Sequence, residues 1–233
     1  MSSRNVASPR NVAPRNGATQ NMDDAAMEVF RATAGARDYP CVGARSVLRQ
    51  GRAEVHGYTE LGAPPTARAL LRHLTRFGES VDLTEGFASF VAVFLRDPGA
   101  DEAAFEGLLW RQLQDVHDID DAAPDPAVSG DPASPDFGFS VAGTAYFVIG
   151  LHPAASRPAR RSPLPMLVFN LHRQFDILRA EGRYERMRDT IRRRDADANG
   201  SVNPMVADHG EASEAAQYSG RYVPRNWRAP FSP

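Results

Sequence analysis

The spacing of apolar residues in the first half of the chain predicts helices and strands that follow one another. Met27, Val29 and Phe30 form part of a helical stripe, which predicts a helix over Asp23–Ala34. The next elements expected are the short segment Ala44–Arg49, a strand over Gly51–Leu61, a helix over Thr66–Phe77 and a strand over Phe87–Leu95. A helix ending near Val116 follows, and its apolar residues share one face: Phe105, Leu108, Leu109, Leu113 and Val116.

The second half of the chain likewise mixes apolar spacing typical of helices with apolar spacing typical of strands. Its expected elements are strands over Phe137–Ile149 and Met166–Phe169, helices over Asn170–Ala180 and Tyr184–Arg194, and a short helix around Ala212–Gln217. Because strands and helices are interspersed, the sequence predicts an α+β class, or a mixed α/β one. We expect a single domain over residues 23–233, with a mixed sheet of short strands flanked by helices.

Two segments differ from this pattern in composition. Residues 1–22 repeat a short Arg-Asn-Val-Ala unit, carry no acidic residue and have little apolar content, which predicts a disordered basic arm. Residues 118–136 are rich in Asp and Pro and poor in apolar residues, which predicts an acidic surface loop or a lid. A solvated linker is the plainer interpretation of the same stretch.

Charge and composition exclude several classes of function. The formal net charge is -2, so the protein as a whole carries no field that favours nucleic acid or an anionic membrane. Every basic side chain is Arg, which excludes a lysine Schiff base. Cys41 is the single cysteine, so no internal disulfide forms. No apolar run suits a signal peptide or a membrane span, and we expect a cytoplasmic protein.

One candidate site lies where a buried strand ends. The apolar run Ala145–Ile149 leads into His152, and Arg157, Arg160 and Arg161 follow it. A histidine at a strand end is well placed to be a ligand, because the strand fixes its backbone. The arginines suit carboxylates or phosphates. A solvated basic loop beside a core histidine explains the pattern equally well.

A second candidate is His172, which opens a helix directly after a buried strand. A helix N-terminus favours a neutral imidazole or an anion there, although a hydrogen-bonding residue at a helix start is the simpler interpretation. Residues Asp195–Val202 resemble the start of an EF-hand loop. The twelfth position of that loop, which needs a bidentate Glu, is Val206, so we reject calcium binding.

Four motifs, taken together and in this order, resemble the YqcI/YcgG family: Tyr39–Ala44, Gly150–Arg161, Phe169–Phe175 and Asn203–Arg221. The resemblance covers the chain from about Asp38 to Phe231. It implies a haem-dependent oxygenase that N-hydroxylates a guanidine or amine group of a small, cationic, arginine-like molecule. It further implies non-covalent haem b containing iron, dioxygen or peroxide, and an external electron donor. The protein partners it suggests are a separate reductase and a second copy of the chain in a homodimer.

The resemblance also suggests roles for individual residues. His152 is the first choice for the iron ligand, with His172 and Cys41 as alternatives. The expected haem-propionate partners are Arg157, Arg160 and Arg161. The residues expected to hold the substrate cation or to line its pocket come from the last motif: Asp208, Glu211, Glu214, Tyr218 and Arg221. A non-catalytic haem-binding or haem-sensing protein and a haem-free ligand-binding module are the alternative functions.

Overall fold

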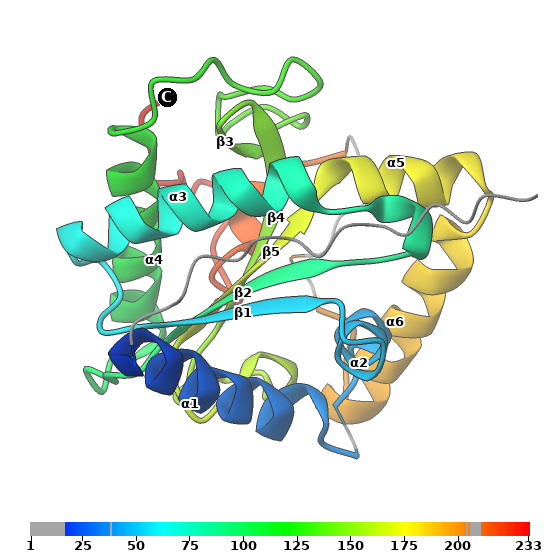
Figure 1. Ribbon diagram of the computed structural model, residues 1–233. Coiled ribbons are helices and arrows are strands. Elements are labelled where there is room, and N and C mark those ends of the chain that lie inside the picture. The colour runs from blue at the N-terminus through cyan, green and yellow to red at the C-terminus, as the bar shows by residue number, and fades with distance from the viewer. Residues whose placement is uncertain (1–16, 38, 204, 206–210) are drawn as a thin grey trace, which may run out of the picture.

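The protein is built on one five-stranded sheet with helices on both faces (Figure 1). The structure, a computed structural model, describes residues 17–37, 39–203, 205 and 211–233. The strands lie in the order β1 (Ala53–Tyr58), β2 (Ser89–Phe94), β5 (Met166–Leu171), β4 (Thr144–Leu151) and β3 (Phe139–Val141). The predicted α+β class with a mixed sheet is confirmed.

Strand direction follows from the connections. β1 and β2 are parallel, because the helix α3 (Pro64–Ser80) crosses over between them. The other strand pairs are antiparallel. The single strand expected over Phe137–Ile149 is instead a hairpin, so that prediction was wrong. Its turn is Ala142–Gly143, where φ is 48° and 72°, values that an uninterrupted strand does not adopt.

The alternation of side chains along β2 divides the core into two layers. Val91 and Val93 face the layer formed with α1 (Gly17–Ala34) and α2 (Val42–Arg49). Phe90 and Phe94 face the other layer, with α3 and α4 (Glu102–His117). Figure 1 shows α1 and α3 on opposite sides of the sheet. Burial on both faces explains why β2 reads as a continuous apolar run rather than an alternating one.

Two described α-helices follow β5, and three short 3-10 helices lie elsewhere along the chain. They are α5 (His172–Ala180), α6 (Tyr184–Asn199) and the short 3-10 helices η1 (Leu83–Glu85), η2 (Pro158–Arg160) and η3 (Glu214–Gln217). α6 ends at Gly200, whose φ of 75° is the left-handed conformation typical of a helix C-terminus. No described helix is long and apolar enough to cross a membrane.

The first helix begins earlier than the sequence pattern predicts. α1 starts at Gly17, so residues 17–22 are helical and do not belong to a disordered arm. The rest of the expected arm, residues 1–16, lies outside the described residues. The acidic loop 118–136 is tied to the β3–β4 hairpin, because Asp120 accepts a hydrogen bond from the Ala142 amide at 2.7 Å and Asp125 one from the Ala145 amide at 3.0 Å.

Candidate functional site

His152 directly follows β4, as the sequence predicted. Its backbone N–H donates to the Arg160 carbonyl at 3.0 Å, and its ring stacks on Phe105 of α4 with a centroid distance of 4.3 Å. The residue is 2% exposed, and its Nδ1 atom is buried without a hydrogen-bond partner. Burial lowers its pKa, and nearby carboxylates only partly oppose this effect. His152 is therefore a neutral imidazole with an unused ring nitrogen, an arrangement that calls for an explanation.

The arginines that follow His152 bind protein groups in this structure. Arg160 donates to the carbonyls of Gly150 at 3.1 Å and Gln217 at 2.9 Å. Its side chain packs over Gly220, where a Cβ would lie 2.9 Å from the Arg160 Cγ. Because φ at Gly220 is also 81°, only glycine fits there easily. Arg160 thereby joins the end of β4 to the segment after η3.

The other two arginines anchor the same loop. Arg157 donates to Asp195 of α6 at 2.7 Å and to the Ser201 carbonyl at 2.8 Å. Arg161 donates to the carbonyls of Ala155 and Ser156, at 2.7 and 3.1 Å. A guanidinium carries five N–H donors, so each of these arginines keeps capacity beyond the bonds described.

Three carboxylates from the 97–101 loop and the start of α4 lie near His152. The carboxylates of Glu102, Asp97 and Asp101 are close enough to raise its pKa against the larger effect of burial. Asp101 also lines an open hollow of about 700 Å³ between the loop 98–101 and α4, and Arg111 is among its other lining residues. The three carboxylates place negative charge near the neutral histidine.

Cys41 lies at the N-terminus of α2, where its Sγ accepts a hydrogen bond from the Ala44 amide at 3.5 Å. Burial raises the pKa of this thiol, although the backbone amides of Ala44 and Gly43 and the charge of Arg160 act in the opposite direction. A protonated thiol is a poor ligand for iron, because the thiolate is the ligating form.

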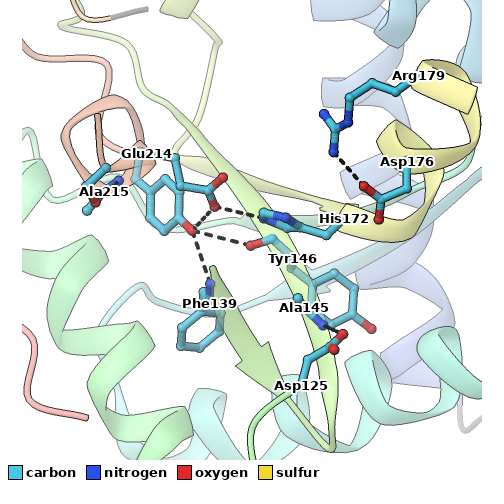
Figure 2. A network of polar contacts seen from close by, with 11 residues as sticks. Asp125, Phe139, Ala145, Tyr146, His172, Asp176, Arg179, Glu214 and Ala215 are labelled. Atoms are coloured by element: carbon cyan, nitrogen blue, oxygen red, sulfur yellow. Dashed lines mark hydrogen bonds and ion pairs between the residues drawn. The ribbon is translucent and has the colours of Figure 1, made fainter. Parts of the chain in front are cut away.

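A second cluster joins His172, Glu214 and Tyr218. The Glu214 Oε1 atom lies 3.0 Å from the His172 Nε2 and accepts a hydrogen bond from the Tyr218 hydroxyl at 2.6 Å. Figure 2 shows the Glu214 carboxylate beside the His172 ring. Burial, and then the Glu214 charge, raise the pKa of Tyr218 well above its usual value. The phenol therefore stays protonated, and its hydroxyl donates a hydrogen bond to the carboxylate.

The two clusters lie at opposite ends of the β4–β5 ladder. Leu151, beside His152, pairs with Met166, whereas Leu171, beside His172, pairs with Tyr146. The five residue steps between these pairs correspond to roughly 17 Å of strand. The structure therefore does not bring His152 and the Glu214 carboxylate into one pocket. Tyr218 connects the two regions, since its carbonyl accepts a hydrogen bond from the Gly150 amide at 2.7 Å.

The sequence profile of the YqcI/YcgG family matches residues 30–232. The chain belongs to the YqcI/YcgG family. No curated protein and no solved structure matches it. In this family member, the His152 cluster and the His172 cluster both lie within the matched residues.

Three further residues that the resemblance pointed to are Arg221, Glu211 and Asp208. Arg221 binds Glu106 of α4 through two nitrogens, at 2.6 and 3.2 Å. Glu106 also accepts hydrogen bonds from Ser219 at 2.9 Å and from the Trp227 indole at 3.2 Å. Glu211 is exposed, and Asp208 lies outside the described residues. Sequence reasoning missed Glu106, although it shares a helical face with Trp110 and Leu113.

The YqcI/YcgG chain also buries a polar cluster at the edge strand β1 that the sequence pattern did not reveal. His56, 2% exposed, has its Nδ1 atom 3.3 Å from Asp23 of α1 and its Nε2 atom 3.0 Å from Glu54. Its ring stacks on His73 of α3, with a centroid distance of 4.2 Å. The His73 Nδ1 atom lies 2.8 Å from the Tyr58 hydroxyl. The cluster joins α1 and α3 through the edge of the sheet.

This cluster predicts a loss of stability in mild acid. Burial, followed by the charges of His56, Arg76 and Arg72, lowers the pKa of His73 from its ordinary 6.5 to about 4. Between these two pH values the unfolded chain binds a proton that the folded chain does not, so the free energy of unfolding decreases as the pH falls below 6.5. Chemical denaturation at a series of pH values measures this slope.

His73→Asn is the matched variant for that measurement. Asparagine offers an acceptor for the Tyr58 hydroxyl but does not titrate, so the slope below pH 6.5 should become shallower. An unchanged slope would assign the acid sensitivity to other groups.

Proposed function

We propose that the protein is a haem-dependent monooxygenase that hydroxylates a guanidine or amine nitrogen of a small arginine-like molecule, with His152 as the iron ligand. The observation that carries this proposal is the buried Nδ1 atom of His152, which has no hydrogen-bond partner. Family membership supports it through the motif in which His152 lies.

The residues around His152 fit such a group. Its depressed pKa keeps the imidazole neutral, the form that ligates iron, and stacking on Phe105 fixes the plane of the ring. His172 is the alternative ligand. Its Nε2 atom contacts Glu214, and in many metal-binding histidines a carboxylate orients the ring in this way through the nitrogen that does not bind the metal. Cys41 fits least, because its thiol is held protonated.

The propionates would interact with the arginine donors that the protein leaves unused. The Arg157 side chain is partly accessible, and its two described hydrogen bonds both come from one terminal nitrogen. The described bonds of Arg160 and Arg161 each use two nitrogens. Arg157 is therefore the best placed of the three to bind a propionate.

The substrate cation would be held near His152 by carboxylates of the 97–101 loop. Asp97 and Asp101 are exposed and act on the pKa of His152, whereas Glu214 lies at the other end of the strand. A bound haem would supply the activation of oxygen. The chain would orient the imidazole through Phe105 and attract the guanidinium through the carboxylates of the 97–101 loop.

The test is the absorption spectrum of protein expressed with a haem precursor. We expect a Soret band that His152→Ala abolishes and His172→Ala retains, because only the first change removes the ligand. Added imidazole should restore the band in His152→Ala by filling the space left by the ring. Circular dichroism reports whether each variant is folded.

Turnover is measured on the same samples as oxygen consumption with arginine and a reductant. A Soret band without arginine-dependent oxygen consumption would show that the protein binds haem but does not hydroxylate arginine. It would then act on another substrate or have no catalytic activity. Colourless wild-type protein, or a band lost only in His172→Ala, would overturn the assignment to His152.

A further inference from the structure

We propose that Trp227, Trp110 and Tyr218 form an electron relay that ends on a redox-active tyrosine, with Glu214 as the acceptor of the tyrosine proton. The inference rests on the proposed function only for its oxidant in the cell, the oxygen-activating haem. Its elements are three neighbouring aromatic rings, of which Trp110 and Tyr218 are stacked, and the carboxylates that accept hydrogen bonds from Tyr218 and Trp227.

The three rings form a continuous path from the surface to the interior. The Trp110 ring stacks on Tyr218 with a centroid distance of 5.5 Å and an angle of 17°, and its centroid lies 6.2 Å from that of Trp227. Trp110 and Tyr218 are buried, whereas Trp227 is partly exposed. Both tryptophans of the chain belong to this path.

The hydrogen-bond partners distinguish the ends of the path from its middle. The Tyr218 hydroxyl donates to Glu214 at 2.6 Å, and the Trp227 indole N–H donates to Glu106 at 3.2 Å. The Trp110 indole nitrogen is buried without a partner. Each end of the path can therefore release a proton to a carboxylate when it is oxidised. Oxidised Trp110 has no such acceptor, which makes it a transient carrier.

The step at Tyr218 balances as follows. A one-electron oxidant removes an electron from the Tyr218 phenol, its O–H bond breaks, and the proton passes to the Glu214 Oε1 atom. The products are a neutral tyrosyl radical and a neutral carboxylic acid. An electron from a thiol or ascorbate at the surface then reaches Tyr218 through Trp227 and Trp110, and the proton returns to the phenol oxygen.

The backbone of Tyr218 lies beside the proposed haem site, whereas its hydroxyl lies with Glu214 towards the other end of β4. The Tyr218 carbonyl accepts a hydrogen bond from Gly150, two residues before His152, and a Cβ on Gly150 would lie 2.9 Å from that same oxygen. The same Cβ would lie 2.8 Å from Phe105, whose ring stacks on His152. Oxidising equivalents that do not reach a substrate would thus have a route away from the site.

The relay is tested on the full-length protein by photo-oxidation, which needs no haem. Light and a sacrificial quencher convert ruthenium tris-bipyridine to its one-electron oxidant, and electron paramagnetic resonance identifies the radicals. We expect a long-lived tyrosyl radical in the wild type and its loss in Tyr218→Phe. In Trp110→Phe the path is interrupted, so a tryptophan radical at Trp227 should replace the tyrosyl signal.

Two further variants test the proton transfer to Glu214 and whether another buried tyrosine gives the same radical. Tyr146→Phe is the matched control, because Tyr146 is equally buried but donates to the Leu74 carbonyl, which is no proton acceptor. It should keep the radical. Glu214→Gln retains an acceptor for the hydroxyl but cannot take its proton, so the radical yield should fall and the slowing of its formation in D2O should disappear.

The result that overturns the relay is a tyrosyl radical that survives Tyr218→Phe, or one unaffected by Trp110→Phe, in variants whose circular dichroism matches the wild type. Because the oxidant is added, these outcomes are independent of the Soret experiment. A colourless protein with the Tyr218 radical would retain the relay and reject the haem.

Discussion

Gly57→Ala is expected to detach α1 from the sheet. A Cβ on Gly57 would lie 2.6 Å from the carbonyl carbon of Met22 and closer still to its oxygen. These are backbone atoms of α1, so the clash can be relieved only by moving the helix. Asp23 would then lose the amide of Gly57, which it binds at 3.0 Å, and its contact with His56.

The cost combines overpacking with the loss of buried polar contacts, and we expect the free energy of unfolding to fall by about 3 kcal/mol. The apolar residues that α1 contributes to the core would become accessible: Ala26, Phe30 and Ala34. Urea denaturation measures the loss, and hydrogen exchange should show faster exchange confined to α1.

Gly107→Ala is the matched control. Gly107 lies within α4, and no atom surrounds the position of its Cβ within 4 Å. The same substitution should therefore stabilise the protein by about 0.5–1 kcal/mol, as alanine does within a helix. Unaltered exchange of α1 in Gly57→Ala would show that the helix does not depend on this close approach.

Glu106→Ala is expected to have the second large effect. The Glu106 carboxylate is buried and receives donors from Arg221, Ser219 and Trp227. Its removal leaves these donors without their acceptor and Arg221, whose side chain is 27% exposed, without its counter-charge. Breaking a buried pair in this way costs about 3 kcal/mol of unfolding free energy.

Glu85→Ala provides the comparison at equal distance between the charged groups. The Arg52–Glu85 pair has the same distance, 2.6 Å, as the Arg221–Glu106 pair, but the Glu85 side chain is 70% exposed. Removing the Glu85 carboxylate should lower the free energy of unfolding by at most about 1 kcal/mol, because water replaces the interaction. Equal losses in the two variants, measured by urea denaturation, would contradict the role given to burial.

The periodicity of the sequence was sufficient to predict most helices and strands. α3, α4 and β2 lie close to the ranges expected from their apolar spacing, because each buries a regular face or run. The hairpin at Ala142–Gly143 was missed, since apolar residues continue on both sides of the turn. α1 was predicted too short, because residues 17–22 contribute few apolar positions to the pattern.

The sequence by itself determined the fold class, the family motifs and the position of His152 at the end of a strand. The tertiary structure alone decided that His172 lies at the other end of that ladder, that the arginines bind protein groups, and that Tyr218 stacks on Trp110. The reason is physical. Periodicity records which face of an element is buried, whereas the partners of a side chain depend on register and on contacts between distant segments.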